Sequence, residues 1–316
     1  MQAVVVRHPG GPAVLENVTV PTPKAKPGWS LIHVKGRGVN HSEVFTREGK
    51  SPSVVFPRIL GIEAVGTIAE STEATRLPVG QTVVTFMGEM GRAYDGSYAE
   101  YVLVPNAQIF PVNTELPWAA LAAVPETYYT AYGALLGLRL QAGDYVLVRG
   151  GTSGVGVAAA KLAHAMADVT VTATTRQLSK TDQLQAAGFD TVVEEREGQL
   201  LTSEKFDRVL DLIGPATVAD SLTHLNSGGI VSSTGQLGGQ WTLTDFDPIM
   251  RIPNDCYLTS FYSGDVQVTR IQDLLQLITS HNIDVTPVKT FPLHEMRAAH
   301  EYLASYHSFG KVVVLS

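Results

Sequence analysis

Four glycines lie within seven residues of the segment YVLVRGGTSGVGVAAAKLA, between an apolar β-branched run and a run of small residues typical of a helix. A strand, a glycine-rich turn and a helix in this order form the fingerprint of a dinucleotide-binding turn. Gly151 is expected to let the backbone turn sharply, Gly154 to let it approach a pyrophosphate, and Gly156 to bring helix and strand close together. The predicted cofactor contacts in this turn are Gly151, Thr152, Ser153, Gly154, Val155 and Gly156.

Ser153 stands where the strict pattern has its second glycine, so the turn is a variant of the fingerprint. The amides at the start of the helix would face the phosphates, where the helix dipole also favours negative charge. A tight strand-to-helix turn without a ligand is the alternative interpretation. The order of strand, turn and helix favours nucleotide binding over it.

The next expected strand and the loop after it, VTVTATTRQLSKT, bear on which nucleotide would bind. NAD-selective sites place an acidic residue about 20 positions after the first glycine, where it binds the ribose 2′-hydroxyl. Here no carboxylate lies between Asp168 and Asp182, and the window carries Thr175, Arg176 and Lys180. A 2′-phosphate would be attracted by the guanidinium of Arg176. The sequence therefore predicts NADPH, and the alternative is that both cations are solvated loop and helix-start charges.

The elements that must position these residues follow two different patterns along the chain. Up to about residue 120, short β-branched runs such as LIHV and YAEYVLV alternate with glycine and proline, which indicates an irregular β-rich domain. From 122 to 262, apolar strands alternate with helices, which indicates a doubly wound parallel sheet covered on both faces. Two more helices and a last strand, KVVVLS, follow. That strand has no place in the alternating unit, so we expect it to pair with the N-terminal β domain.

Composition limits the classes of function. The 316 residues carry a formal net charge of −7 and a single cysteine, Cys256. A negative chain offers no basic footprint for nucleic acid, and one cysteine permits neither an internal disulfide nor a zinc site with two thiolates. No apolar run approaches the roughly 18 residues of a membrane span, and no signal-peptide core precedes Arg7. We expect a soluble cytoplasmic protein with a small-molecule partner and neither a nucleic-acid nor a membrane partner.

Several segments in a fixed order resemble the medium-chain dehydrogenase/reductase superfamily, specifically its zinc-free quinone oxidoreductase branch, which includes zeta-crystallin. The resemblance runs over essentially the whole chain. It implies an α/β fold with a Rossmann doubly wound parallel-sheet cofactor domain at 122–262 and a GroES-like β-rich catalytic domain built from 1–121 and 263–316. It also implies that the last strand returns to the N-terminal domain. The segments are GRGVNHSEVFTREG, PRILGIEAVGTI, VPETYYTAYGAL, VLVRGGTSGVG, VLDLIG and GKVVVL.

The zinc-dependent alcohol dehydrogenases of this superfamily hold their catalytic metal with two cysteines and a histidine. The matching positions are here Asn40, Ile62 and Glu126, with Glu63 retained. Isoleucine cannot coordinate a metal and an amide oxygen is a poor zinc ligand, so we predict no metal site. His41 lies beside Asn40, but no second ligand stands at useful spacing, which favours a surface or hydrogen-bonded histidine.

Without a Lewis acid, the chemistry expected is hydride transfer to an acceptor that takes it readily, such as a quinone or an α,β-unsaturated carbonyl. The resemblance places Asn40 near the nicotinamide and the substrate oxygen, where its amide hydrogens could stabilise negative charge. Thr130 matches a threonine that approaches the nicotinamide, and Glu126 could donate a proton if burial raised its pKa. The alternatives are that Asn40 caps a helix starting at His41, that Thr130 is only a buried helix residue, and that Glu126 caps a helix starting at Thr127.

The resemblance also implies further contacts along the cofactor. They are Gly214, Gly235, Phe261 and Ser263, although each glycine could serve only a turn. A family tyrosine near the 2′-phosphate is replaced by Glu194, an acid that could weaken binding of that phosphate.

Where the family often has tyrosines lining the substrate cleft, this chain has Phe45, Lys50 and Ser51, which alters the polarity of the pocket. A homodimer formed through strands at about 241–262 is implied as well. Two other functions remain open, an enoyl-thioester reductase on the same fold and a non-catalytic NADPH-binding protein.

Overall fold

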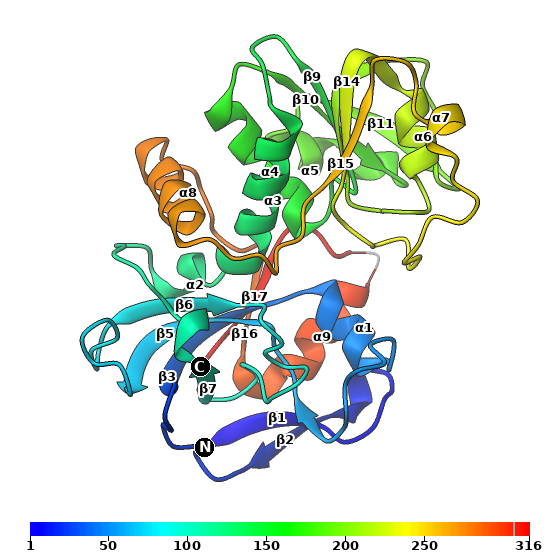
Figure 1. Cartoon of the computed structure of the whole chain (residues 1–316). Helices are drawn as coiled ribbons and strands as arrows, with labels where there is room; N and C mark the ends of the chain where they lie inside the picture. Colours follow the sequence, from blue (N-terminus) through cyan, green and yellow to red (C-terminus); the bar gives the residue numbers. More distant parts are fainter. Residues whose placement is uncertain (306) are drawn as a thin grey trace. The chain divides into compact units, whose positions relative to one another are not determined.

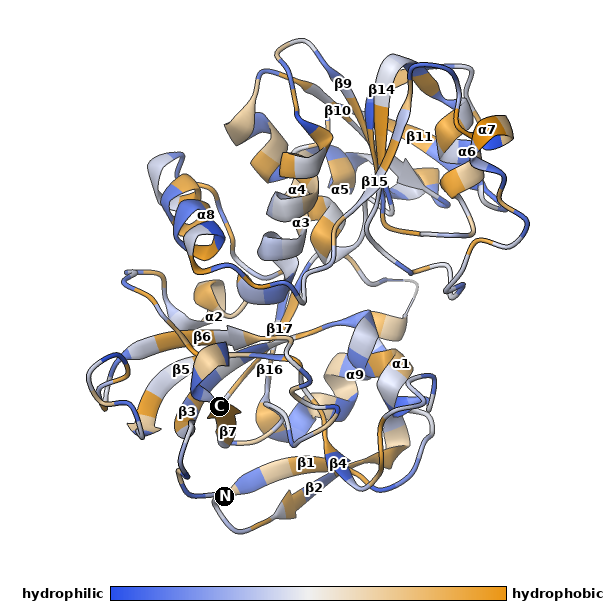
Figure 2. Cartoon of the chain, viewed as in Figure 1, coloured by the Kyte–Doolittle hydropathy of each residue, from blue (hydrophilic) through white to orange (hydrophobic). Residues whose placement is uncertain are grey.

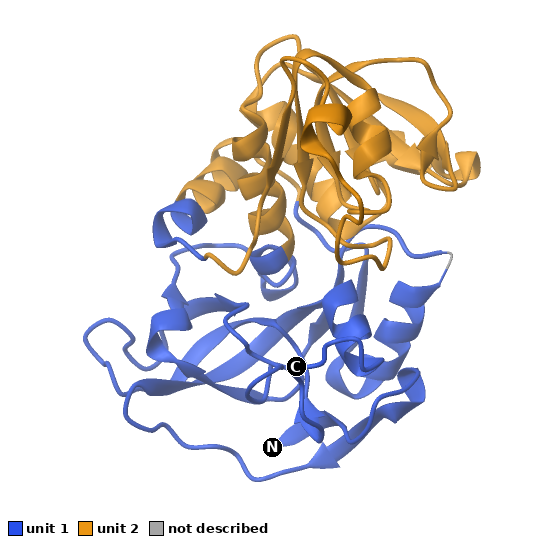
Figure 3. Cartoon of the chain, turned by 45° about the vertical axis from the view of Figure 1, so that its right-hand side comes forward, with its two compact units in different colours: residues 1–126, 266–272, 285–316 blue, residues 127–265, 273–284 orange. Residues whose placement is uncertain are grey.

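The computed structural model describes residues 1–305 and 307–316 and divides them into two compact units (Figure 3). Unit 1 comprises 1–126, 266–272 and 285–316, and unit 2 comprises 127–265 and 273–284. The sequence placed the changes of domain at 121/122 and 262/263. In the structure they fall a few residues later, and 273–284 belongs to unit 2.

Unit 2 is built on a seven-stranded sheet in the order β12-β11-β10-β9-β13-β14-β15 (Figure 1). All its pairs are parallel except β11 with β12, which form an antiparallel pair. The order of the six parallel strands is that of the doubly wound dinucleotide-binding fold, whose strand order reverses between the first and fourth strands. Here these are β9 and β13, so a ligand is expected at their carboxyl ends. The strands are β9 (Tyr145–Arg149), β10 (Thr170–Thr175), β11 (Thr191–Arg196), β12 (Gln199–Leu200), β13 (Phe206–Asp211), β14 (Leu225–Ser233) and β15 (Tyr257–Ser260).

The helix that follows the glycine turn, α4, is rich in small residues. In α4, the alanines at 158, 159, 160 and 163 are buried, and their size lets the helix lie close to the sheet. Helix α8 is amphipathic instead, because Ile271, Leu274 and Ile278 form one buried face while the opposite face is polar (Figure 2). The helices are α3 (Pro125–Leu138), α4 (Gly154–Met166), α5 (Thr181–Ala186), α6 (Val218–Thr223), α7 (Pro248–Arg251) and α8 (Val268–Ser280).

Unit 1 contains a three-stranded sheet, β2-β1-β4, and a seven-stranded sheet, β16-β17-β3-β5-β6-β8, in which β7 also pairs with β3. The last strand, β17, pairs antiparallel with β3, so the expected return of the C-terminus to the N-terminal domain is confirmed (Figure 1). The strands are β1 (Gln2–Val6), β2 (Leu15–Thr19), β3 (Trp29–Val39), β4 (Arg58–Ile59), β5 (Glu63–Glu70), β6 (Thr82–Phe86), β7 (Tyr101–Pro105), β8 (Phe110–Pro111), β16 (Lys289–Pro292) and β17 (Val312–Leu315). Its helices are α1 (His41–Arg47), α2 (Trp118–Leu121) and α9 (Met296–Ala304).

Strand β3 organises unit 1 because it pairs with β7, β5 and β17 along its eleven residues. Its alternating apolar residues, such as Ile32 and Val34, enter one core together with Ile68 and Val104. Its carboxyl end leads directly to Asn40 and α1. The strand thus carries the first candidate catalytic residue to a fixed point beside the C-terminal strand.

Within the part of the chain that is described, no helix is both long enough and apolar enough to cross a membrane.

Candidate active site

The glycine turn of unit 2 is held by contacts that leave no room for side chains. Gly150 has a φ of +83°, so the left-handed residue of the turn is Gly150. The sequence had instead suggested Gly151 for the sharp bend. At Gly151, an added Cβ would lie 2.8 Å from the Cβ of Ala173 on β10. At Gly156, it would lie 2.5 Å from the carbonyl oxygen of Gly150. The first turn of α4 is therefore packed directly on the end of β9, as a dinucleotide-binding turn requires.

Ser153 explains why this variant of the turn needs no second glycine. Its backbone is extended, at φ −75° and ψ 162°, which any residue can adopt. Its hydroxyl group donates to the carbonyl oxygen of Gly150 at 2.7 Å and accepts from the amide of Gly156 at 3.0 Å, so it caps α4. The amides of Gly154 and Val155 head the 13-residue helix, where the helix dipole favours a phosphate. Thr152 is half-buried beside them.

A buried ionic network beneath the turn was not anticipated from the sequence. Arg149, the last residue of β9, is fully buried and pairs with Glu195 at 3.0 Å and with Asp220 at 2.7 Å. It also donates to the hydroxyl oxygen of Ser221 at 3.0 Å, and that hydroxyl donates to Asp211 at 2.7 Å. Because such groups are costly to bury unpaired, the network fixes the carboxyl ends of β9 and β13 relative to each other.

The loops after β13 and β14 meet the glycine turn. Asp211 accepts hydrogen bonds from the amides of Ile213 at 3.0 Å and Gly214 at 2.9 Å, which sets the first loop. Gly214, at φ +91°, then lies against the carbonyl oxygen of Gly235, and an added Cβ would clash there. An added Cβ on Gly150 would come within 3.4 Å of Leu237. The structure thus gathers the turn, Gly214 and Gly235 at one edge of the sheet.

Phe261 lies over Gly133 of α3, so closely that a Cβ there would enter its ring. Its ring centroid is 5.8 Å from that of Tyr129. Thr130 on the same helix is 8% exposed, and Ser263 is equally buried. The predicted nicotinamide-end residues Phe261 and Thr130 therefore come from segments that contact each other within unit 2.

The predicted 2′-phosphate residues follow the end of β10. Arg176 is exposed and Lys180 is half-buried. The pKa of the Lys180 ammonium is lowered by partial burial and by the positive charge of Arg176, so the two cations are close enough to repel each other. Thr175 shapes this loop, because its hydroxyl oxygen accepts from the amide of Gln177 at 3.1 Å. A bound anion would reduce the repulsion between these two neighbouring cations.

Glu194, the acid expected to weaken this site, stands opposite Thr175 on the adjacent strand β11. Its carboxylate forms an ion pair with Arg196 at 2.5 Å. This partner reduces the negative charge that a phosphate would meet.

The second group of candidate residues forms a hydrogen-bonded cluster in unit 1. The Lys311 ammonium donates to Asn40 Oδ1 at 2.7 Å and to Glu63 Oε1 at 2.7 Å. Asn40 Nδ2 donates to the same Glu63 oxygen at 2.8 Å. Glu63 is fully buried and the Lys311 side chain is 6% exposed, so these are low-dielectric contacts. We refer to Asn40, Glu43, Glu63 and Lys311 as the Asn40 cluster.

Glu43 completes this cluster as a buried carboxyl group without a charged partner. Its Oε1 accepts from the amide of Ile62 at 3.3 Å and lies 3.4 Å from Asn40 Nδ2, whereas Oε2 has no hydrogen-bond partner among the described residues. Burial, and secondly the negative charge of Glu63, raise the pKa of Glu43 to about 7, against the lowering effect of Lys311. Glu43 can therefore hold a proton close to neutral pH.

The interpretation of Asn40 as a helix cap is wrong. Asn40 occupies the N-cap position of α1, but its side chain makes no capping hydrogen bond and turns to Glu63 and Lys311 instead. Helix α3 begins at Pro125, so Glu126 does not precede the helix but lies in its first turn. The amide of Glu126 donates to Glu63 Oε2 at 2.9 Å, so the buried carboxylate satisfies this first-turn donor.

The positions that match zinc ligands in related enzymes contain no ligand set. The side chain of Ile62 is buried and has no donor atom, and the Asn40 oxygen already accepts from Lys311. Among the described residues, no three His, Cys, Asp or Glu side chains are arranged to hold a metal ion. His41 is half-buried, and burial lowers its pKa.

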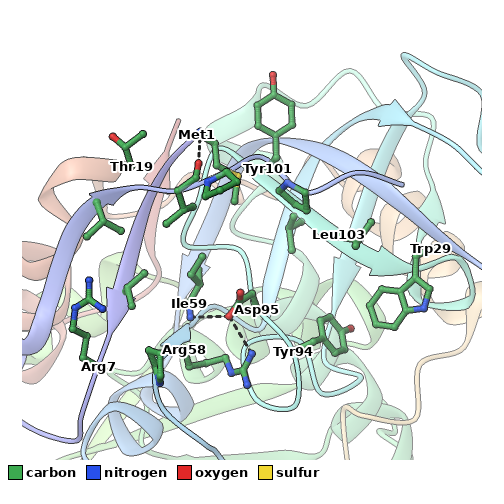
Figure 4. A pocket seen from close by; sticks show the side chains of 18 of the residues that line it. Met1, Arg7, Thr19, Trp29, Arg58, Ile59, Tyr94, Asp95, Tyr101 and Leu103 are labelled. Carbon is green, nitrogen blue, oxygen red and sulfur yellow. Dashed lines mark hydrogen bonds and ion pairs between the residues drawn. The ribbon is translucent and has the colours of Figure 1, made fainter. Parts of the chain in front are cut away.

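The residues expected to alter the substrate pocket interact with one another or with α1. The Lys50 ammonium lies 5.3 Å from the centroid of the Phe45 ring, and the hydroxyl of Ser51 is hydrogen bonded to that of Thr46 at 2.9 Å. A separate pocket of about 550 Å³ in unit 1 is lined by Trp29, Tyr94 and other residues but includes none of the predicted site residues (Figure 4).

Two family descriptions match successive parts of the chain. Residues 26–114 match the alcohol dehydrogenase GroES-like domain, and residues 187–314 match the zinc-binding dehydrogenase family. The chain spans 65% of the zinc-type alcohol dehydrogenase-like protein C337.11 of Schizosaccharomyces pombe and 15% of the phenolphthiocerol synthesis polyketide synthase Pks15/1 of Mycobacterium bovis, with 29% identity to each.

The human quinone oxidoreductase is 31% identical over 252 residues, which cover 75% of this chain and 74% of that protein. The structure of the quinone oxidoreductase from Coxiella burnetii matches all of this chain and 99% of its own, with a TM-score of 0.86 and 25% identity. Mycobacterial Rv1454c, complexed with NADPH, matches over the full length of both chains with a TM-score of 0.84 and 27% identity. Together with the fold and the two groups of site residues, these similarities show that the chain belongs to the medium-chain dehydrogenase/reductase superfamily, in its quinone oxidoreductase-like branch.

Proposed function

We propose that this protein is an NADPH-dependent, zinc-independent oxidoreductase that reduces a quinone or an α,β-unsaturated carbonyl compound. The observation that carries the proposal is the glycine turn together with Arg176 and Lys180 at the end of the adjacent strand. The turn packs the first turn of α4 against the end of β9 and against β10 so closely that a Cβ at Gly151 or Gly156 would clash, and this packing places the amides at the start of α4 beside the strand end. The two cations supply charge for a third phosphate. These residues fit NADPH, which when bound supplies the hydride.

The choice of NADPH over NADH is supported by the charges around β10. The described residues of the loop at 176–181 include Arg176 and Lys180 and no carboxylate. Glu194 is paired with Arg196. The NADPH complex of Rv1454c, a relative of similar fold, is consistent with this choice.

In unit 1, the Asn40 cluster supports chemistry that needs no metal. Lys311 provides a positive charge among Asn40, Glu63 and Glu43, and Glu43 can hold a proton at its unpartnered oxygen. Both amide hydrogens of Asn40 are directed at carboxyl oxygens, at 2.8 and 3.4 Å. Asn40 would therefore have to exchange its weaker contact, to Glu43, in order to donate to a substrate oxygen. Thr130 on α3 is the proposed contact of the nicotinamide end. The amide of Glu126 donates to Glu63, and the carboxyl group of Glu126, whose Oε2 atom is buried, stays the proposed proton donor.

Steady-state oxidation of NADPH in the presence of a quinone, an enal and an enoyl thioester tests the reaction. We expect turnover with the quinone or the enal, at the same rate after treatment with a chelator. Metal analysis of the purified protein should find no stoichiometric zinc. Zinc at one equivalent per chain, or activity abolished by the chelator, would contradict the proposal.

Enoyl-thioester reduction is the second candidate. It is supported by Pks15/1, a polyketide synthase, which aligns over 96% of this chain at 29% identity; the quinone oxidoreductase of Lama guanicoe aligns over 100% at the same identity, so the kinetic comparison decides between the two candidates. A kcat/KM for the enoyl thioester well above that for quinone and enal would establish this alternative. Tight NADPH binding without turnover on any acceptor would instead indicate a non-catalytic NADPH-binding protein.

The assembly that we propose is a homodimer formed through residues 241–262 of a cytoplasmic protein. Strand β15 lies at the edge of the unit 2 sheet and pairs with β14 alone, and its residue Tyr257 is exposed. Close to it in sequence, Ile249 is 90% exposed and Met250 is 77% exposed. Open strand edges and exposed apolar side chains are typical of association surfaces. Light scattering of the protein and of an Ile249→Asp, Met250→Asp variant tests the dimer, and an unchanged mass would contradict this interface.

A further inference from the structure

Lys311 lies directly before the C-terminal strand, and no motif in the sequence assigned it a role. We propose that Lys311 is a positioning residue of the candidate active site, whose ammonium group fixes the direction of the Asn40 amide and holds it against Glu63. The inference deepens the proposed function and rests on it for its kinetic consequence. Its structural basis is independent of any substrate.

The hydrogen-bond chemistry allows only one orientation of the Asn40 amide. A lysine ammonium has donors and no acceptor, so the amide oxygen must face Lys311, at 2.7 Å. An ionised carboxylate has acceptors and no donor, so the amide nitrogen must face Glu63, at 2.8 Å. Lys311 and Glu63 are themselves joined at 2.7 Å. The three groups form a closed ring in which reversing the amide would break two contacts at once.

Asn40 gives up a favourable local contact to join this ring. An asparagine at the N-cap position commonly accepts from a first-turn amide of its own helix, which contributes about 1 kcal/mol. Asn40 occupies this position of α1 without making that bond. Its side chain instead reaches Lys311, which is 271 residues away in the sequence. The contacts to Lys311 and Glu63 therefore outweigh capping, as expected for charge-assisted hydrogen bonds in a buried setting.

The backbone of β3 provides the space for the ammonium group. Gly38 stands opposite Val313 of β17 in the antiparallel register. A Cβ on Gly38 would clash with Nζ of Lys311 and with Oε1 of Glu63. Gly38 has no left-handed φ, so the requirement for glycine at this position is steric. The pair of β3 and β17 can therefore accommodate the Lys311 side chain only because residue 38 has no side chain.

The first experiment needs no enzymatic activity. The side-chain NH₂ signals of Asn40 can be assigned by their loss in Asn40→Ala in ¹⁵N-labelled full-length protein. We expect hydrogen-bond-shifted and slowly exchanging signals in the wild type and in Lys311→Arg. In Lys311→Met they should move toward the free-amide position and exchange faster. Unchanged Asn40 signals in Lys311→Met would overturn the inference, even if the proposed reaction is observed.

The second experiment is a kinetic double-mutant cycle with NADPH and a quinone. We expect Lys311→Met to lower kcat roughly tenfold with little change in KM, and Lys311→Arg to restore most of it. In the Asn40→Ala background the same Lys311→Met change should have no further effect on kcat, because Lys311 acts through Asn40. An equal loss in both backgrounds would refute this. Lys289→Met, an exposed lysine on the neighbouring strand β16, is the matched control that should retain wild-type kcat.

If no acceptor is turned over at all, the proposed function fails, and the NMR experiment still decides the role of Lys311. If Lys311→Met lowers stability, a second variant, Glu63→Gln with Lys311→Met, separates the loss of stability from the loss of kcat, because it removes both buried charges. We expect this double variant to regain stability without regaining kcat. Recovery of both would show that Lys311 only neutralises Glu63.

Discussion

The glycine turn of unit 2 and the Asn40 cluster of unit 1 solve the problem of holding polar groups in place by opposite means. The turn is built from seven consecutive residues, and apart from the hydroxyl group of Ser153 its geometry depends on glycines that carry no side chain. The cluster uses charged and amide side chains from the residue after β3, from α1 and β5, and from the residue before β17, which come together only when the sheet forms. The turn should therefore be sensitive to added volume, and the cluster to changes of charge.

The largest expected effect is that of removing one charge from the cluster. Glu63→Gln leaves the Lys311 ammonium buried without its counter-charge, and loss of one partner of a buried pair costs about 4 kcal/mol of unfolding free energy. Urea denaturation measures this. The control is Glu301→Gln, which removes an exposed helix pair with Arg297 and should cost less than about 0.5 kcal/mol. Similar losses for the two variants would show that burial does not distinguish the cluster from the surface.

Glu43 should make the stability of the protein depend on pH. Its pKa rises from 4.5 in the unfolded chain to about 7 in the folded protein, so the folded state binds more protons between these values. Stability contributed by the protonated group is present below pH 4.5 and is lost as the pH rises through about 7, by about 3 kcal/mol in all. Glu43→Gln removes this dependence. Relative to the wild type, the variant should gain stability from pH 5 to pH 8, and parallel curves would contradict the shifted pKa.

Added volume should damage the turn while leaving charge unchanged. In Gly156→Ala the new methyl group meets the Gly150 carbonyl at 2.5 Å, and overpacking of this kind costs about 2 kcal/mol. We expect a corresponding loss of affinity for NADPH and NADH alike, measured by nucleotide fluorescence. The control is Gly137→Ala, near the end of helix α3, where the nearest atom to the new methyl group is 3.9 Å away; it should leave both affinities unchanged. A Gly156→Ala protein with wild-type affinity would show that the turn does not bind the nucleotide.

Selectivity between NADPH and NADH should depend on side chains in the loop that follows β10. Arg176→Ala should weaken NADPH binding roughly tenfold and leave NADH binding unchanged, because only NADPH carries the 2′-phosphate. Isothermal titration with both nucleotides separates the two cases. An equal loss for both would defeat the assignment of Arg176 to that phosphate.

The smallest effect is expected at Arg196. Arg196→Ala removes the ion-pair partner of Glu194 and should raise the Kd for NADPH about twofold to threefold, since exposed pairs contribute well under 1 kcal/mol. The double variant with Glu194→Gln should reverse the change. A loss of NADPH affinity that persists in the double variant would indicate that Arg196 itself binds the nucleotide.

What could be predicted from the sequence follows the same division. The parallel sheet of the cofactor domain and the return of the last strand were confirmed by the sheet pairings. The role of the glycine turn in binding a cofactor stays a prediction. The assignment of the sharp turn to Gly151 failed because two adjacent glycines can each adopt a left-handed φ, and only packing against Leu212 and Ala173 distinguishes them. The alternative in which a helix starts at Thr127 differs from the structure by two residues, because α3 begins at Pro125, a residue favoured at the first helical position.

The ring formed by Lys311, Asn40 and Glu63 could not be read from the sequence, since its members are far apart and each is ordinary in its local context. The same holds for Arg149, whose partners Glu195 and Asp220 lie on different elements. A charged residue directly before or at the end of a strongly apolar strand was the available signal in both cases. Such a residue must either reach solvent or find a buried partner, and only the fold decides which.

The arrangement of the Asn40 cluster depends on Gly38, which is not itself a polar residue of the cluster. Substituting alanine there changes no charge, no hydrogen-bonding group and no residue of the ring, yet it occupies the space of the ammonium group. A substitution at Gly38 could therefore displace the buried ammonium charge although residue 38 carries no polar group in its side chain. During divergence of related sequences, gain of a side chain at this point would have to follow or accompany loss of the lysine.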